Sequence, residues 1–108
     1  MQPSPFLGGP TELLVLLVLR RARLHGWGIM LRLQQLSRDG VQLDELAVSS
    51  TLRRLQERGW VEAEVKTVEA TLTVPVYRLT RQGRQHCKQL REEYARITAA
   101  IARLMLRT

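Results

Sequence analysis

Cysteine and long apolar runs are both scarce in this sequence. Cys87 is the single cysteine, so no disulfide can form within the chain, as is typical of a reducing compartment, and we expect a cytoplasmic protein. The strongest apolar run, residues 13–19, is far shorter than the ~20 residues that span a bilayer. Arg20, Arg21 and Arg23 follow it, without a small-residue cleavage site. This run predicts a buried helix, and we expect no membrane partner.

Groups that carry catalysis or hold metals are also few. The sequence has no grouping of serine, histidine and acid, no glycine-rich phosphate loop and no recognisable pair of carboxylates. His86 and Cys87 are adjacent, so they point to different sides of a helix, and no third ligand lies at a useful spacing. His25 begins a predicted helix, where a structural hydrogen bond is favoured. We predict no enzyme, no metal and no cofactor.

Lysine is nearly missing from a strongly basic chain. There are 17 basic and 10 acidic residues, a net charge of +7, and only Lys66 and Lys88 are lysines. The planar fork of arginine suits phosphate and guanine, so this composition favours a nucleic-acid partner. Charge alone is equally consistent with an ordinary solvated surface. The placement of the arginines has to decide between a nucleic-acid interface and an ordinary solvated surface.

Residues 43–79 carry the most informative pattern. Asp44 is expected to cap a helix over residues 45–58, which Gly59 ends. A half-buried strand is predicted over 60–66 and a second strand, rich in branched residues, over 72–79; a tip at 67–71 joins them, and Pro75 is expected at an edge or bulge. A helix followed by such a hairpin is the reading helix and wing of a winged helix-turn-helix. The expected fold is therefore mainly α with a small β-hairpin.

Two further helices are predicted before this unit, after a loose proline- and glycine-rich arm at residues 1–10. The first, over 11–22 with Thr11 as its cap, is apolar on every face. Such a helix must be buried on several sides, either by a second subunit or by a long helix lying across it. The second helix, over 27–37, has its core side chains at helical spacing, namely Ile29, Met30, Leu33 and Leu36.

The last predicted helix, over 81–107, contains a heptad seam. At 1.5 Å per residue it would be roughly 40 Å long, too long for this small domain to bury. A partner helix is the economical explanation, although the seam can equally pack on the first helix of the same subunit, and both can hold. We expect a DNA-binding domain at 1–80 and a dimerisation helix at 81–108. Cys87 opens the seam, and the predicted homodimer contacts are Leu90, Tyr94, Ile97, Ile101 and Leu104.

The helix over 45–58 has two distinct faces at 100° per residue. One is apolar and comprises Val48, Thr51, Leu52 and Leu55. The other is polar and comprises Ser49, Ser50, Arg53, Arg54 and Glu57. Short hydroxyls and arginines suit a DNA groove, but an ordinary amphipathic surface helix has the same pattern.

Four short motifs follow one another along the chain. They are residues 24–27 (LHGW), 52–55 (LRRL), 57–64 (ERGWVEAE) and 77–80 (YRLT), the last followed by Gly83. Their order and spacing together resemble the PadR-type transcriptional regulators over nearly the whole chain. The resemblance implies a winged helix-turn-helix with a C-terminal dimerisation helix that packs on the first helix. It also implies binding of inverted-repeat operators, mostly as repressors, with release of DNA by phenolic or drug-like molecules in some members.

The chain departs from the family pattern in two places. Its reading helix has residues 46–52 (LAVSSTL) where the family usually has glycine, serine or threonine, leucine, tyrosine, proline, alanine and leucine. The wing has residues 72–75 (LTVP) where the family usually has arginines and a lysine. Several phosphate contacts are therefore expected to be missing, which weakens non-specific affinity. An interaction module that has lost operator binding stays open as an alternative.

The resemblance sharpens the roles of individual residues. Arg53 is the best candidate for reading a base, and Arg54 for a phosphate. Ser49 and Ser50 could contact phosphate or base edges, and Lys66 is taken as the only basic residue left in the wing. Double-stranded DNA and a second copy of the chain are thus the expected partners. Trp60 is expected in the core, whereas Trp27 or Tyr94 could line a cavity for a small hydrophobic or aromatic effector.

Overall fold

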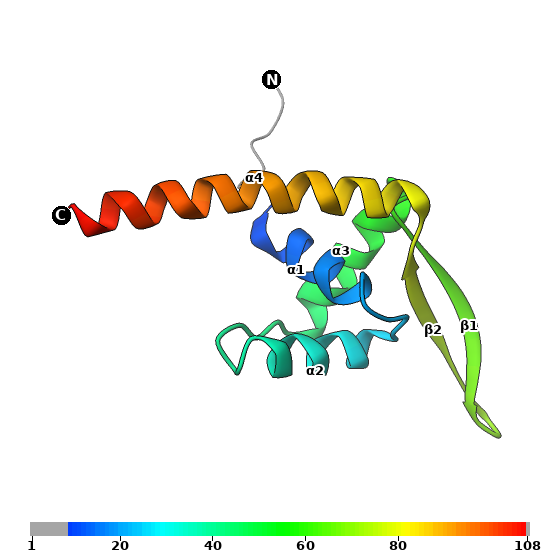
Figure 1. The fold of residues 1–108 in the computed structure, drawn as a ribbon. Helices are drawn as coiled ribbons and strands as arrows, with labels where there is room; N and C mark the ends of the chain where they lie inside the picture. The colour runs from blue at the N-terminus through cyan, green and yellow to red at the C-terminus, as the bar shows by residue number, and fades with distance from the viewer. Residues whose placement is uncertain (1–8, 108) are drawn as a thin grey trace.

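The computed structural model describes residues 9–107, except the side chain of Val68. Four helices and one hairpin follow one another (Figure 1). Their bounds are Gly9–Leu19 (α1), Gly26–Leu36 (α2), Glu45–Glu57 (α3), Val61–Glu69 (β1), Leu72–Leu79 (β2) and Arg81–Leu106 (α4). The long helix α4 crosses over α1, and the hairpin projects away from the helices. The predicted fold class, a winged helix-turn-helix with a long C-terminal helix, is confirmed.

The first helix begins and ends earlier than predicted. It starts at Gly9, so Thr11 lies inside it rather than capping it, and Pro10 occupies the first turn, where its fixed φ is favourable. It ends at Leu19 instead of residue 22, because the chain then turns and Leu24 exchanges two backbone hydrogen bonds with Tyr77 of β2. Residues 1–8 of the predicted arm lie outside the described residues.

Both ends of α3 are fixed by local hydrogen bonds, as predicted. The Asp44 carboxylate accepts a 2.7 Å hydrogen bond from the Ala47 backbone N–H at the start. At the end, Gly59 has a φ of +77°, and its N–H donates to Gln56. The Trp60 N–H donates to the Leu55 carbonyl, which completes a Schellman turn. The orientation of α3 is thereby set at both ends.

The hairpin is longer and more exposed than predicted. β1 runs on to Glu69, the tip is only Ala70 and Thr71, and the register shifts between Thr67 and Glu69. The expectation of a half-buried first strand is wrong beyond Val61, because the Val65 side chain is 69% exposed. Alternation of apolar and charged residues identifies the strand. It does not reveal whether another element covers the apolar face, and here the hairpin leaves the domain.

The core lies between α1, α2, α3 and the first half of α4. The apolar residues of α1 are buried or half-buried around its whole circumference, since α2 and α3 pack against it and α4 lies across it. From α4, only Gly83, Cys87 and Leu90 are buried. The alternative of a long helix covering α1 within the same subunit is therefore realised.

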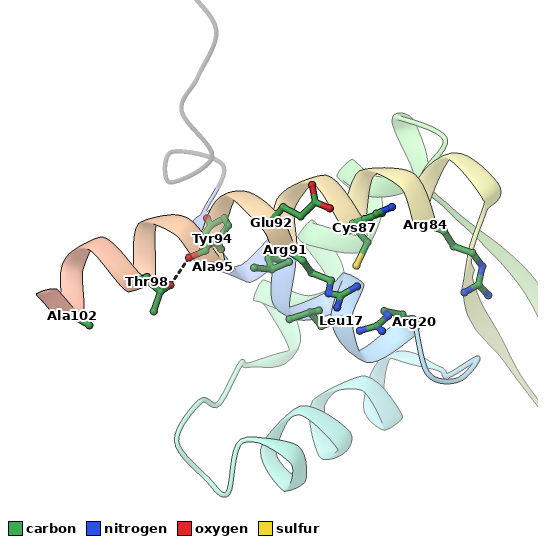
Figure 2. Close-up of a pocket in the computed structure, with 13 residues that line it drawn as sticks. Leu17, Arg20, Arg84, Cys87, Arg91, Glu92, Tyr94, Ala95, Thr98 and Ala102 are labelled. Atoms are coloured by element: carbon green, nitrogen blue, oxygen red, sulfur yellow. Dashed lines mark hydrogen bonds between the residues drawn. The ribbon is translucent and has the colours of Figure 1, made fainter.

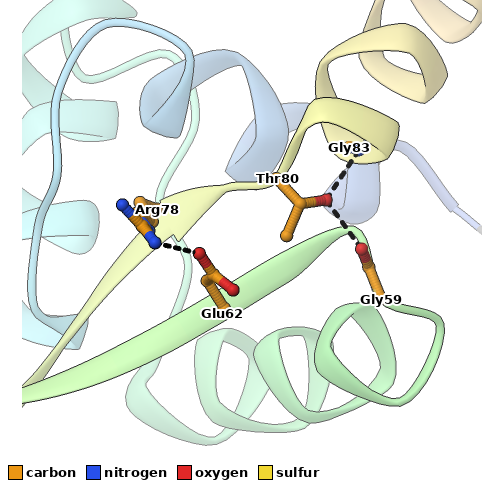
Figure 3. A network of polar contacts seen from close by, with 5 residues as sticks. All are labelled: Gly59, Glu62, Arg78, Thr80 and Gly83. Atoms are coloured by element: carbon orange, nitrogen blue, oxygen red, sulfur yellow. Dashed lines mark hydrogen bonds and ion pairs between the residues drawn. The ribbon is translucent and has the colours of Figure 1, made fainter.

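A compact joint connects the end of α3, the hairpin and α4 (Figure 3). The Thr80 hydroxyl donates to the Gly59 carbonyl at 2.6 Å and accepts from the Gly83 N–H at 3.0 Å. The Thr80 N–H donates to the Trp60 carbonyl at 3.0 Å. A Cβ atom on Gly83 would lie 1.8 Å from that carbonyl oxygen, so only glycine fits there. The start of α4 is thus fixed against the end of α3.

Candidate nucleic-acid interface

The polar face of α3 points outward, while Val48, Thr51, Leu52 and Leu55 are buried beneath it. Arg53 is exposed and makes no hydrogen bond or ion pair with another residue in the described part of the chain. Arg54 is also exposed, and its guanidinium donates to the Thr51 hydroxyl at 3.2 Å. Of the two arginines, Arg53 is the one whose donors are all available to a ligand.

The two serines of this face are already bonded to their own helix. Ser49 is exposed and its hydroxyl donates to the Glu45 carbonyl at 2.8 Å. Ser50 is half-buried and its hydroxyl donates to the Leu46 carbonyl at the same distance. In this rotamer each hydroxyl can still accept a hydrogen bond, but it would have to rotate to donate one.

The wing carries more acid than base. Glu62, Glu64 and Glu69 lie on β1 and are exposed, whereas Lys66 is the only basic residue of that strand. On β2 the single basic residue is Arg78, which is already paired with Glu62 across the hairpin (Figure 3). The sequence analysis noted the missing arginines but overlooked these three acids. Their presence in a single nine-residue strand that contains one lysine was the signal that could have revealed them.

An open groove of ≈ 1040 Å³ lies between α1 and α4 (Figure 2). Its apolar wall includes Leu17 of α1 together with Ala95 and Ala102 of α4, and Tyr94 also lines it. The other candidate for an effector cavity, Trp27, does not line this groove, and its side chain is 64% exposed. The groove follows α4 beyond the N-terminal start of α1, as far as Ala102.

The charged end of the groove surrounds Cys87. Burial raises the pKa of this thiol, and nearby arginine charges only partly oppose the effect. Those arginines are Arg91, Arg20 and Arg84. The pKa of Tyr94 is also raised, first by burial and then by the charges of Glu12 and Glu93.

The heptad seam of α4 becomes steadily more exposed toward the C-terminus. Leu90 is 9% exposed and belongs to the core of the chain itself, whereas Ile101 is 45% and Leu104 66% exposed. Tyr94 and Ile97 are half-buried between these extremes. The second half of the predicted seam is therefore an apolar face that no described part of this chain covers.

A stacked aromatic pair at the joint was missed by the sequence analysis. The Trp60 and His86 rings are 3.5 Å apart and nearly parallel, and His86 Nε2 lies 2.9 Å from Glu12 Oε1 of α1. Trp60 was expected in the core; it is half-buried and packs against the core. No local pattern could reveal this cluster, because its members lie far apart in the sequence.

The model of the "Transcriptional regulator PadR-like family" matches residues 15–89, which is more than half of the chain. The chain belongs to the PadR-like family. This family consists of transcriptional regulators, and the predicted resemblance is confirmed. No curated protein sequence matches the chain.

Solved structures agree with the PadR-like fold. A transcriptional regulator from Clostridium thermocellum superposes with a TM-score of 0.80 at 21% identity, covering 95% of this chain and 97% of the other. A putative regulator from Thermoplasma acidophilum gives 0.79 at 22% identity, covering 97% and 98%. Bacillus subtilis PadR in complex with operator DNA gives 0.67 at 19% identity, covering 72% of this chain and 44% of that one. At these identities the likeness establishes the fold.

Other kinds of site are not evident in this PadR-like chain. Among residues 9–107, no three histidine, cysteine or acidic side chains come together as a metal site would require. Within the same range, no helix has the length and apolar character needed to cross a membrane.

Proposed function

We propose that this protein is a dimeric DNA-binding transcriptional regulator, a repressor, that reads an inverted repeat with α3. The observation that carries the proposal is the exposed, unpaired Arg53 on the outward face of a helix fixed at both ends. A helix of this kind enters the major groove with its exposed side chains toward the bases. An arginine there can donate two parallel hydrogen bonds to guanine, the commonest specific contact.

The remaining interface residues have subsidiary roles in this proposal. Arg54 contacts a phosphate, because its guanidinium is partly held by Thr51 and is less able to enter the groove. The hydroxyls of Ser49 and Ser50 accept hydrogen bonds at the edge of the DNA groove, or rotate to donate them. Lys66 supplies a single phosphate contact from the wing, weakened by the neighbouring acids. The regulator needs no cofactor, metal or catalytic residue.

A second copy of the chain is the proposed partner of α4. Its apolar face leaves the domain beyond Tyr94, and an obligate interface is the ordinary reason for such a surface. The proposed contacts are Leu90, Tyr94, Ile97, Ile101 and Leu104, with Leu90 acting mainly through the intrachain core. A small hydrophobic or aromatic effector would bind where the α1–α4 groove remains open, beside Tyr94.

The acidic wing favours a second candidate, an interaction module that has lost operator binding. Its three exposed carboxylates would repel the phosphate backbone, which normally dominates affinity. Duplex binding at low salt separates the two candidates. A wild-type protein that binds neither its own upstream DNA nor random duplex would support the interaction module.

The test of base reading compares two neighbouring arginines. Sequence preference is measured by selecting bound sites from a random duplex pool, and affinities are measured at one fixed salt concentration. Arg53→Ala is expected to relax preference at one base pair per half-site, a loss of about 1–3 kcal/mol of discrimination. Arg54→Ala is expected to weaken all sequences alike, since phosphate contacts carry no sequence information.

A matched control comes from α2. Arg32 is exposed there, and Arg32→Ala removes the same charge from a helix to which we assign no DNA contact. This variant should keep both affinity and preference. If Arg53→Ala instead leaves the selected sequence unchanged, the assigned reading face is incorrect.

A further inference from the structure

A second cavity, beside the α1–α4 groove, is lined by five arginines. It has a volume of ≈ 360 Å³ and contains no acidic lining residue. Three of the arginines come from the turn after α1, one from β2 and one from the first turn of α4. These residues are Arg20, Arg21, Arg23, Arg78 and Arg84, together called the arginine pocket.

The backbone around the arginine pocket is fixed. The Arg20 N–H donates to the Leu16 carbonyl at 2.9 Å, which extends the hydrogen bonding of α1 by one residue. Leu24 and Tyr77 exchange two backbone hydrogen bonds of 3.1 and 2.8 Å. Arg23 and Arg78 are their immediate chain neighbours, so this bridge holds two segments far apart in the sequence side by side. The backbone therefore fixes where these side chains begin, and the guanidinium groups themselves are ordered only when a ligand binds.

The positive charge of the arginine pocket is largely uncompensated. Arg78 pairs with Glu62, but the other four arginines make no ion pair with any residue of the described chain. Like charges gathered at one cavity repel each other, and an anion bound between them would remove this repulsion.

We propose that the arginine pocket binds the oligophosphate group of a small molecule. The terminal phosphoryl group of an oligophosphate carries about −1.5 to −2 charges and each inner one about −1, so two or three of them together offset roughly three to four guanidinium groups. Each guanidinium can also donate two parallel hydrogen bonds to a phosphate. A single carboxylate has one charge and two oxygens and would leave most of these donors unused. The cavity is near the small end of ligand sites, which suits the oligophosphate group itself.

Duplex DNA fits this pocket less well. Arg20 and Arg84 also line the α1–α4 groove (Figure 2), whereas no residue of α3 lines either cavity. The pocket is therefore separate from the face of α3 that we assign to DNA. The pocket is also concave and small, whereas a backbone-tracking surface follows a line of phosphates.

The experiment is a calorimetric titration of the full chain with tripolyphosphate, without DNA and at constant ionic strength. The wild type is expected to bind one tripolyphosphate per chain. The double variant Arg21→Gln with Arg23→Gln should bind at least about tenfold more weakly, because each lost charge-assisted hydrogen bond is worth about one order of magnitude. The control variant Arg32→Gln with Arg107→Gln loses the same charge from exposed sites outside the pocket. It should change the affinity less than about twofold.

Three outcomes would overturn the proposal. One is the absence of saturable binding to the wild type. Another is an equal loss in both double variants, which would indicate diffuse attraction by surface charge. The third is a pocket variant that loses duplex affinity but still binds tripolyphosphate as the wild type does, which would make the arginines a DNA contact. Circular dichroism and thermal unfolding check that each variant is folded. Since the titration contains no DNA, its result is independent of the proposed repressor function.

Discussion

Gly83 is the residue at which α4 approaches the rest of the fold most closely. Its N–H is bonded to the Thr80 side chain, and the Trp60 carbonyl occupies the space where a side chain would begin. Glycine at the third position of a helix is normally unfavourable by about 1 kcal/mol relative to alanine. The packing therefore outweighs the propensity at this position.

Gly83→Ala should destabilise the protein. The new Cβ atom would lie 1.8 Å from backbone oxygen and 2.8 Å from the Trp60 carbonyl carbon, so the backbone itself has to shift. Overpacking of this kind costs about 1–3 kcal/mol or more, which exceeds the gain in helix propensity. Urea unfolding followed by circular dichroism would measure the loss.

Gly28→Ala is a matched control for this prediction. Gly28 occupies the same third position in α2, and its N–H is likewise bonded to the cap side chain, here His25. A Cβ atom there would meet only side-chain atoms, namely Leu24 Cδ2 at 3.3 Å and the His25 ring and Leu24 Cβ at 3.5 Å. This variant should stay within about 1 kcal/mol of the wild type. An equal effect of both substitutions would contradict the steric explanation.

Single residues also mark where sequence reasoning succeeds and where it fails. The roles of Asp44 and Gly59 were predictable because a helix cap is made by residues within one turn. The stacking of Trp60 on His86 was not predictable, since it depends on how α4 crosses the end of α3. The same applies to the arginine pocket, which joins segments more than fifty positions apart.

At the scale of elements, the wing differs most from expectation. Its β-strand pattern and approximate position were correct, but its burial was not, because the apolar face of β1 has no covering element in the described chain. Its surface carries three glutamates and few bases. A wing of this charge should contribute little to DNA affinity, since each neutralised phosphate contributes about 0.9 to the slope of log affinity against log salt.

Adding arginines to the wing should restore phosphate contacts. Leu72 and Thr73 are exposed at the start of β2, where both side chains can be replaced without disturbing the core. Leu72→Arg with Thr73→Arg is expected to steepen the salt dependence of duplex binding by up to about two units. Fluorescence anisotropy with one duplex over a range of salt concentrations would measure this slope.

The control adds the same charge to α4. Gln85→Arg with Gln89→Arg places two arginines one helical turn apart on an exposed part of α4, beside Trp60 rather than on the wing. The slope should change less in this variant. If the wing variant gains nothing although the wild type binds duplex well, the wing does not face DNA.

At the scale of the whole molecule, α4 is too long for the domain it packs on. Its first half is built into the core through Cys87 and Leu90, and its second half extends past α1 with Ile101 and Leu104 exposed. The heptad spacing predicted that α4 could pack on α1 of the same subunit and on a partner helix. It did not predict which half of α4 has which role. That division depends on where α1 begins, because α4 leaves the domain there, and the periodicity of α4 does not contain this information.

Ile97→Asp should separate the proposed dimer. Ile97 is half-buried at the point where α4 leaves the domain, so a carboxylate there would be desolvated in a dimer but solvated in a monomer. The dissociation constant should rise at least about a hundredfold, the equivalent of roughly 2.7 kcal/mol. Sedimentation equilibrium of both proteins over a range of concentrations would measure it.

Gln89→Asp is the matched control, because it introduces the same charge at an exposed site elsewhere on α4. It should leave the dimer intact. A wild-type chain that sediments as a monomer at micromolar concentration would refute the proposed dimer directly.

Separating the dimer also has a consequence for DNA binding, because two copies of α3 reach both half-sites of an inverted repeat only when the dimer sets them about one helical turn apart. Ile97→Asp should therefore weaken binding to a full site while leaving binding to an isolated half-site nearly unchanged. Equal weakening on both would instead indicate that the substitution disturbs the reading domain itself.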